Sequence, residues 1–398
     1  MRKFDFDTLV NRYHTNCVKW DRLNEKDARL HSDVLPLWVA DMDFPCAEGI
    51  QKALQERVAH PIYGYSHATS KAYEDAICGW FQRRFRWTIE PTDLFYSPGV
   101  VPAVSFLISI LSQAGEGIII QEPLYHPFRQ VITANHRKVV NSPLVNDYGV
   151  YHIDFADLEA KMADPDNVGM ILCSPHNPIG RVWTAVELNQ IVDLAVRYDK
   201  WIIADEIHCD IIRKGIIQLP VAKLRPDALD RIIVCTAPSK SFNIAGIKTS
   251  SILIHNPRIK ELWKQEVGGR LHLSDPNVFA QAVTIAAYNE CEEWLNHVND
   301  YIDDNIATAT RLFQVRLPKA IVSPCEGTYL LWVDLRAYCH DPHELETKMR
   351  SKIGVFLNEG YQFGEGGAGF ERINMACPRS VVIEAITRIC EGWRDEYE

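Results

Sequence analysis

Between residues 94 and 254 the chain alternates short apolar runs, rich in β-branched residues, with longer amphipathic stretches. The apolar runs are Leu94–Tyr96, Gly117–Ile120, Val168–Cys173, Trp201–Asp205, Arg231–Thr236 and Ser250–Ile254. Strands that are buried on both faces have this composition, and amphipathic helices between successive strands favour a parallel arrangement. The pattern predicts an α/β fold with a mostly parallel central sheet flanked by helices.

Two of the intervening helices have recognisable starts. Thr184 is followed three residues later by Glu187, which is the capping-box pattern, and a helix is predicted over residues 188–198. Pro102 suits the first turn of a helix that continues over residues 103–111.

The rest of the chain predicts a smaller α+β domain assembled from both ends. Strand patterns occur at 321–335 and 373–376, and helical patterns at 342–351 and 381–396. Residues 278–294 contain no Gly or Pro and predict one helix that joins the two domains. We therefore place the large domain at residues 49–288 and the small domain at residues 1–48 and 289–398.

Charge and composition exclude several classes of partner. The 398 residues carry a net charge of -10, which argues against binding to nucleic acid or to an anionic membrane, since phosphate backbones require a concentrated basic surface. No apolar run is long enough to span a membrane, and the polar start shows no export signal. The eleven cysteines have no metal-ligand spacing. We expect a cytoplasmic protein with reduced thiols and no metal.

Four polar motifs follow predicted strands, at the edge where open α/β sheets bind their ligands. Residues 97–104, SPGVVPAV, form a glycine-containing turn that enters a helix and can offer backbone N–H groups to a phosphate. In residues 174–181, SPHNPIGR, two prolines fix the backbone and aim the Asn177 amide. Taken singly, each motif is equally compatible with an ordinary turn.

The other two motifs contribute a carboxylate and an amine. Asp205 ends the apolar run WIIA and should lie deep, where a buried carboxylate needs a partner such as a protonated ring nitrogen. Lys240, in TAPSKSFNIAG, should lie at the mouth of the sheet, where desolvation would favour the neutral amine that forms a Schiff base. A turn aspartate and a surface lysine are the alternatives.

In this order and spacing, the motifs resemble the fold-type I enzymes that depend on pyridoxal 5'-phosphate (PLP), in the aminotransferase superfamily. The resemblance covers nearly the whole chain. Within the superfamily, WVADMDF, YGYS, CSPHNPIGRVW, DEIHCD, PSKSFNIAG and GFERINMACP look like the carbon–sulfur β-lyases of the cystathionine β-lyase and cystalysin type.

The resemblance implies a role for each motif. Lys240 would hold PLP as a Schiff base and act as general base and acid, and Asp205 would pair with the pyridinium nitrogen. Asn177 would bind the phenolic O3', and Tyr125 would stack on the ring. The remaining assignments are Gly99, Val100, Val101 and Ser239 on the phosphate, Tyr65 on the phosphate of a neighbouring subunit in a homodimer, and Arg372 on the substrate carboxylate.

Three further positions have roles that the motifs leave open, and of these His208 is placed with the cofactor-binding residues. His208 stands where many aminotransferases carry a tyrosine that binds O3', so it is either a cofactor contact or a structural histidine. Lys248 is a candidate for the phosphate or for the surface, and His126 cannot be given a leaving-group role. Ala237 replaces a common phosphate-binding hydroxyl, so one phosphate contact is expected to be missing.

The predicted reaction is α,β-elimination of L-cystathionine, L-cystine or a related S-substituted cysteine to a thiol, pyruvate and ammonia. An aminotransferase would use the same lysine, aspartate, asparagine and arginine. A non-catalytic PLP-binding regulatory protein on this scaffold is a third possibility, because fold does not settle function.

Overall fold

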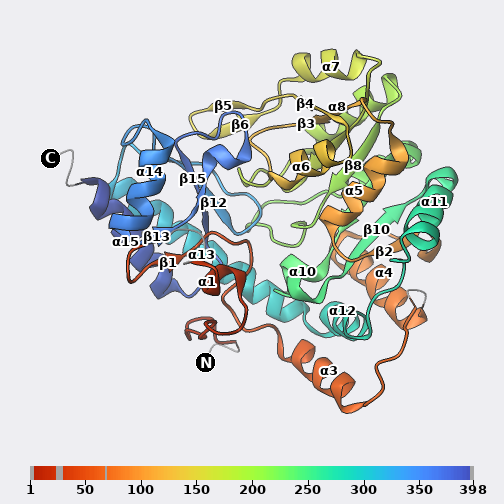
Figure 1. Cartoon of the computed structure of the whole chain (residues 1–398), viewed down its shortest axis with the longest axis horizontal. Coiled ribbons are helices and arrows are strands. Elements are labelled where there is room, and N and C mark those ends of the chain that lie inside the picture. Colours follow the sequence, from red (N-terminus) through yellow and green to blue (C-terminus); the bar gives the residue numbers. More distant parts are fainter. Residues whose placement is uncertain (1–3, 24–29, 68–69, 395–398) are drawn as a thin grey trace.

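The computed structural model describes residues 4–23, 30–67 and 70–394, and its centre is a seven-stranded sheet (Figure 1). The strand order is β2-β10-β9-β8-β7-β3-β4. Their bounds are β2 Leu94–Ser97, β3 Gly117–Ile120, β4 Lys138–Asn141, β7 Asn167–Cys173, β8 Trp201–Asp205, β9 Ile232–Thr236 and β10 Ser250–Ile254. The five strands from β9 to β4 are parallel, and β10 is antiparallel to both of its neighbours. The mostly parallel sheet is confirmed.

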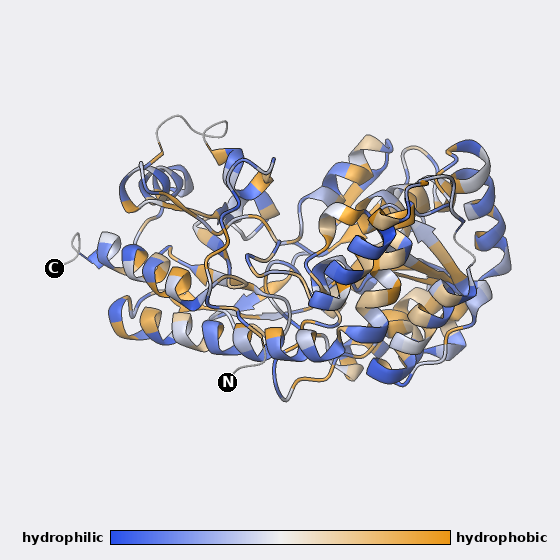
Figure 2. Ribbon diagram, turned by 90° about the horizontal axis from the view of Figure 1, so that it is seen from below, coloured by the Kyte–Doolittle hydropathy of each residue, from blue (hydrophilic) through white to orange (hydrophobic). Residues whose placement is uncertain are grey.

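Each face of this sheet is covered by its own set of helices (Figures 1 and 2). One apolar cluster joins alternate strand residues to α5 (Val100–Leu111), α6 (Pro127–Ala134) and α11 (Pro257–Trp263). The other cluster joins the intervening residues to the helices of the opposite face, which include α4 (Lys71–Phe85), α7 (Phe155–Ala163), α8 (Ala185–Arg197) and α12 (Val278–Glu290). Burial of both faces explains why these strands are continuous apolar runs.

A second sheet and its helices form the other lobe in Figure 2. Its antiparallel order is β11-β12-β15-β14, with bounds Ile321–Val322, Leu330–Asp334, Phe370–Asn374 and Asn358–Glu359. A further apolar cluster packs this sheet against α13 (Glu292–Arg316), α14 (Pro342–Lys348) and α15 (Arg379–Arg394). The N-terminal part of the chain joins this lobe, because β1 (Leu35–Pro36) pairs in parallel with β13 (Val355–Phe356).

The structure confirms one predicted helix start and corrects one predicted helix. The capping box of Thr184 and Glu187 is present as predicted at the start of α8. The single helix expected over residues 278–294 is wrong, because α12 ends at Glu290 and α13 begins at Glu292. The chain breaks there because α12 packs on α3 (Glu48–Ala59) and α4, whereas α13 packs on α15. Residues 395 and 396 of the last predicted helix lie outside the described residues.

Candidate active site

The predicted motifs meet at the carboxyl edge of the large sheet. A cavity of about 210 Å³ lies there, between the ends of β8 and β9 and the start of α5. Nine of the ten predicted cofactor-binding residues line the cavity, namely Gly99, Val100, Val101, Tyr125, Asn177, Asp205, His208, Ser239 and Lys240, and Tyr65 does not. Parallel strands bring these side chains together because their carboxyl ends share one edge.

Lys240 lies in the short helix α10 (Pro238–Ser241), which follows β9 directly. Its Nζ donates a hydrogen bond to the carbonyl oxygen of Ala40 at 2.7 Å. Burial, opposed by the negative charge of Asp41, lowers the pKa of Lys240 to about 8. The neutral amine that nucleophilic and base chemistry require is therefore easier to form at physiological pH than in an exposed lysine.

Asp205 ends β8 and is almost fully buried. Among the described residues its side chain accepts one hydrogen bond, from the backbone N–H of Ile207 at 3.1 Å. Burial raises the pKa of Asp205 to about 7, although Lys240 opposes the shift. A carboxylate left this poorly paired in a buried position favours a cationic ligand.

The α5 end of the cavity suits a phosphate group. Gly99 caps α5, and Val100 and Val101 are its first two residues, so their backbone N–H groups belong to the positive end of a twelve-residue helix. Ser239 and Lys248 line the same cavity, whereas Ala237 is buried and does not. Lys248 adds a positively charged side chain to the cavity lining.

Arg372 orients Asn177. The Arg372 Nη1 donates to Asn177 Oδ1 at 3.0 Å, so the amide NH2 of Asn177 is the group left to donate into the cavity. Arg372 is itself buried, and burial lowers its pKa to about 10. Its Nη2 also donates to the Trp38 carbonyl oxygen and to Asn358 Oδ1. The cavity lining does not include Arg372, which lies behind Asn177.

Two aromatic side chains complete the wall. Tyr125 comes from the cis-proline-containing segment after β3, and its backbone N–H donates to the Asn177 carbonyl oxygen at 3.0 Å. The buried His208 has no hydrogen-bond partner for Nδ1 among the described residues, and burial lowers its pKa well below the ordinary value. Burial thus favours the neutral form of the His208 imidazole, and its ring meets the ring of Tyr329 edge to face at 5.8 Å.

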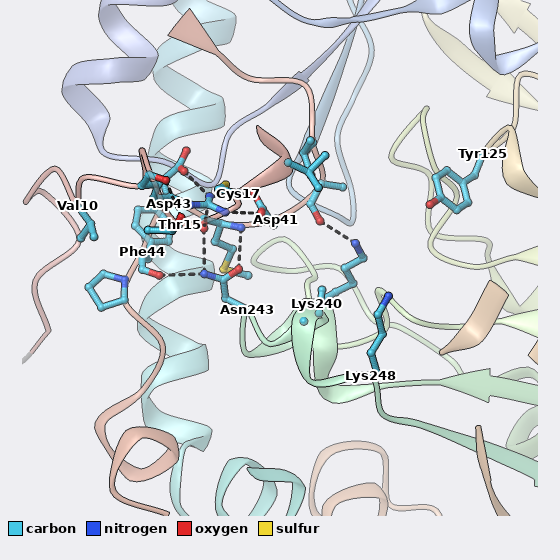
Figure 3. A pocket seen from close by; sticks show the side chains of 18 residues that line it. Val10, Thr15, Cys17, Asp41, Asp43, Phe44, Tyr125, Lys240, Asn243 and Lys248 are labelled. Carbon is cyan, nitrogen blue, oxygen red and sulfur yellow. Dashed lines mark hydrogen bonds and ion pairs between the residues drawn. The ribbon is translucent and has the colours of Figure 1, made fainter. Parts of the chain in front are cut away.

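The cavity opens into a vestibule of about 830 Å³, which shares Ala40, Tyr125, Lys240 and Lys248 with it (Figure 3). One wall is the segment 38–44, which we call the strap. The Asn243 side chain makes hydrogen bonds to the backbone of Met42 and Phe44 in the strap. Asn374 donates to the carbonyl oxygens of Val39 and Asp41. Figure 3 shows Lys240 pointing to this wall.

Three predicted residues line neither cavity: Arg372, described above, and Tyr65 and His126. The Tyr65 side chain is fully exposed. His126 precedes α6 and is in aromatic contact with Tyr125 and Phe363. Sequence reasoning missed the Ala40 carbonyl and Tyr329, because a backbone acceptor has no signature and Tyr329 reads as part of a buried strand.

The sequence matches the family model for aminotransferase class I and II over residues 32–389. It is 38% identical to cystathionine beta-lyase PatB of Bacillus subtilis over 97% of this chain and 98% of the relative. Among solved structures, cystalysin from Treponema denticola, which contains pyridoxal 5'-phosphate, is similar with a TM-score of 0.95 and 35% identity over 99% of both chains. A PLP-bound C-S lyase from Staphylococcus hominis has a TM-score of 0.91 and 33% identity over 98% of both chains.

Proposed function

This chain belongs to the class I and II aminotransferase family, and we propose that it is a PLP-dependent carbon–sulfur β-lyase. The observation that carries the proposal is the separation of a buried amine from a buried carboxylate at one cavity. Lys240 contacts a carbonyl oxygen and Asp205 contacts a backbone N–H, so neither is neutralised by the other through a hydrogen bond. The named lyase relatives support the choice of reaction.

The residues present fit PLP. A carboxylate with a raised pKa needs a cation, and the ring nitrogen of PLP provides one. The amine of Lys240 matches the aldehyde of PLP, the NH2 of Asn177 matches its phenolic oxygen, and the N-terminus of α5 matches its phosphate. When bound, PLP supplies an electron sink for negative charge that develops at the substrate Cα.

The chain's own groups then have distinct tasks. Asp205 would hold the proton of the ring nitrogen, Tyr125 would cover the ring, and Arg372 would orient Asn177. To bind the substrate carboxylate as well, Arg372 must exchange its hydrogen bond to the Trp38 carbonyl oxygen for one to the substrate. Lys240 Nζ accepts the Cα proton, the Cβ–S bond breaks, and the sulfur leaves as a thiol. With one water molecule consumed, the three-carbon fragment becomes pyruvate and ammonia.

The protein is proposed to act as a homodimer in the cytoplasm. Tyr65 is fully exposed beside the exposed Ile62 and Tyr63, which is consistent with a segment that another subunit covers. No helix in the described part of the chain is long and apolar enough to cross a membrane.

Pyruvate release in the absence of any keto acid tests this function. Purified protein supplied with PLP should release pyruvate from L-cystathionine or L-cystine, and Lys240→Ala should not. Activity that appears only when a keto acid is added would make the protein an aminotransferase. A yellow, PLP-loaded protein that turns over no cysteine derivative would support a regulatory role instead.

A further inference from the structure

The carbonyl oxygen of Ala40 accepts hydrogen bonds that join three segments far apart in the sequence. It accepts the Lys240 Nζ–H at 2.7 Å and the hydroxyl of Tyr329 at 2.8 Å. Ala40 belongs to the strap, Lys240 follows a strand of the large sheet, and Tyr329 immediately precedes β12 of the small sheet. The Tyr329 side chain is completely buried. From this geometry we propose that Tyr329 is a positioning residue for the base Lys240, acting through the Ala40 carbonyl; the proposal rests on the proposed function.

The Tyr329 hydroxyl is not needed to hold the strap in place. The carbonyl oxygens of Trp38, Val39, Asp41, Met42 and Phe44 all accept hydrogen bonds from the side chains of Arg372, Asn374 or Asn243. Ala40 is the position where the acceptor is shared with the reactive lysine. A second donor to the Ala40 carbonyl oxygen therefore affects the position of Lys240 more than it affects the position of the strap.

The chemical consequence follows from the geometry of an amine. A neutral amine that donates one N–H to a fixed acceptor has its lone pair restricted in direction, which a base that removes a Cα proton requires. Tyr329 keeps the acceptor fixed whether or not Lys240 is bonded to it, because its own hydrogen bond does not depend on the lysine. Its ring also packs against His208 in the cavity wall.

Tyr329→Phe tests the proposal because it removes the hydroxyl and keeps the ring that contacts His208. Tyr151→Phe is the matched control: Tyr151 is also buried, and its hydroxyl accepts from Trp332 Nε1 at 2.9 Å, in a contact that does not involve Lys240. With a sulfur substrate, Tyr329→Phe should lower kcat about 10-fold, the worth of one well-placed hydrogen bond, with little change in KM. The primary isotope effect with Cα-deuterated substrate should rise, because proton removal becomes more strongly rate-limiting.

A labelling experiment on the apoprotein tests the role of Tyr329 without depending on catalytic turnover. In the apoprotein, the rate at which an amine-selective reagent modifies Lys240, followed by peptide mass spectrometry, should rise several-fold in Tyr329→Phe and not in Tyr151→Phe. Equal rates in both variants, together with an unchanged isotope effect, would overturn the positioning role. If wild type releases no pyruvate but the labelling difference is found, the proposed function fails and the Tyr329 contact stands.

Discussion

Two aspartates buried to the same degree behave in opposite ways. Asp43 on the strap contacts Arg12 at 2.6 Å, Lys19 at 2.5 Å and the Trp20 Nε1 at 3.2 Å, and the two cations hold its pKa below the ordinary value despite burial. Asp205 has one backbone donor, and burial raises its pKa to about 7.

Two lysines, Lys19 and Lys240, show the same contrast in how their amines are paired. Lys19 is fully buried and ion-paired with Asp43, whereas Lys240 donates to a carbonyl oxygen and has its pKa lowered to about 8. On the strap, the fold satisfies its buried charges within the chain. At the cavity, the fold keeps the Asp205 carboxyl apart from the Lys240 amine. A buried acid and amine that are kept apart indicate a binding site, whereas a paired acid and amine form a structural ion pair.

The largest expected effect comes from Asp205→Asn, which keeps an acceptor for the Ile207 N–H and removes the charge. We expect pyruvate release to fall by about 1,000-fold, about 4 kcal/mol, because the ring nitrogen loses its anionic partner. Steady-state assays at saturating PLP, with binding measured separately by absorbance, separate this effect from weaker cofactor affinity. A variant with near-normal kcat would show that Asp205 is not the ring-nitrogen partner.

The matched change on the strap is Asp43→Asn. Removing the nearer partner of a buried ion pair leaves Lys19 with only the Asp41 carboxylate at 3.9 Å, so the free energy of unfolding should fall by about 3 kcal/mol. Denaturant unfolding of the apoprotein measures this loss. An Asp43→Asn protein as stable as wild type would remove the contrast between the two aspartates.

The smallest effect is a stability gain in Asp205→Asn that depends on pH. A carboxyl whose folded pKa is raised from 3.8 to about 7 carries little penalty below pH 4, and its penalty grows as pH rises from 4 towards 7 and levels off above 7. The apoprotein of Asp205→Asn should therefore match wild type near pH 4 and exceed it by about 2 kcal/mol at pH 5.5. Unfolding curves at both pH values would contradict this if the difference were constant.

Much of the large sheet was predictable, because strands buried on both faces are continuous apolar runs with clear ends. Gly117–Ile120, Trp201–Asp205 and Ser250–Ile254 have the predicted bounds. The strand β4 went unpredicted, since Lys138–Asn141 begins and ends with polar residues and lies at the edge of the sheet. Nothing in the sequence around Cys291 indicates that one helix ends and the next begins there, because the break arises where the chain changes the helices that it packs against.

The site was predictable where a motif follows a strand. The cavity positions of Lys240, Asp205 and Asn177 follow from strand ends that share one edge. Contacts across the fold were not predictable: the hydrogen bonds of Ala40 to Tyr329 and Lys240 join residues 289 and 200 positions apart. Such pairs depend on how the strap crosses between the two sheets.

The most direct test of the central claim is to find which lysine binds PLP. Wild-type protein incubated with PLP is reduced with borohydride, which makes the bond between the lysine and the cofactor permanent, and its peptides are analysed by mass spectrometry. We expect the cofactor mass on Lys240 and not on Lys19 or Lys248. A label on another lysine, or no label at any lysine, would contradict it.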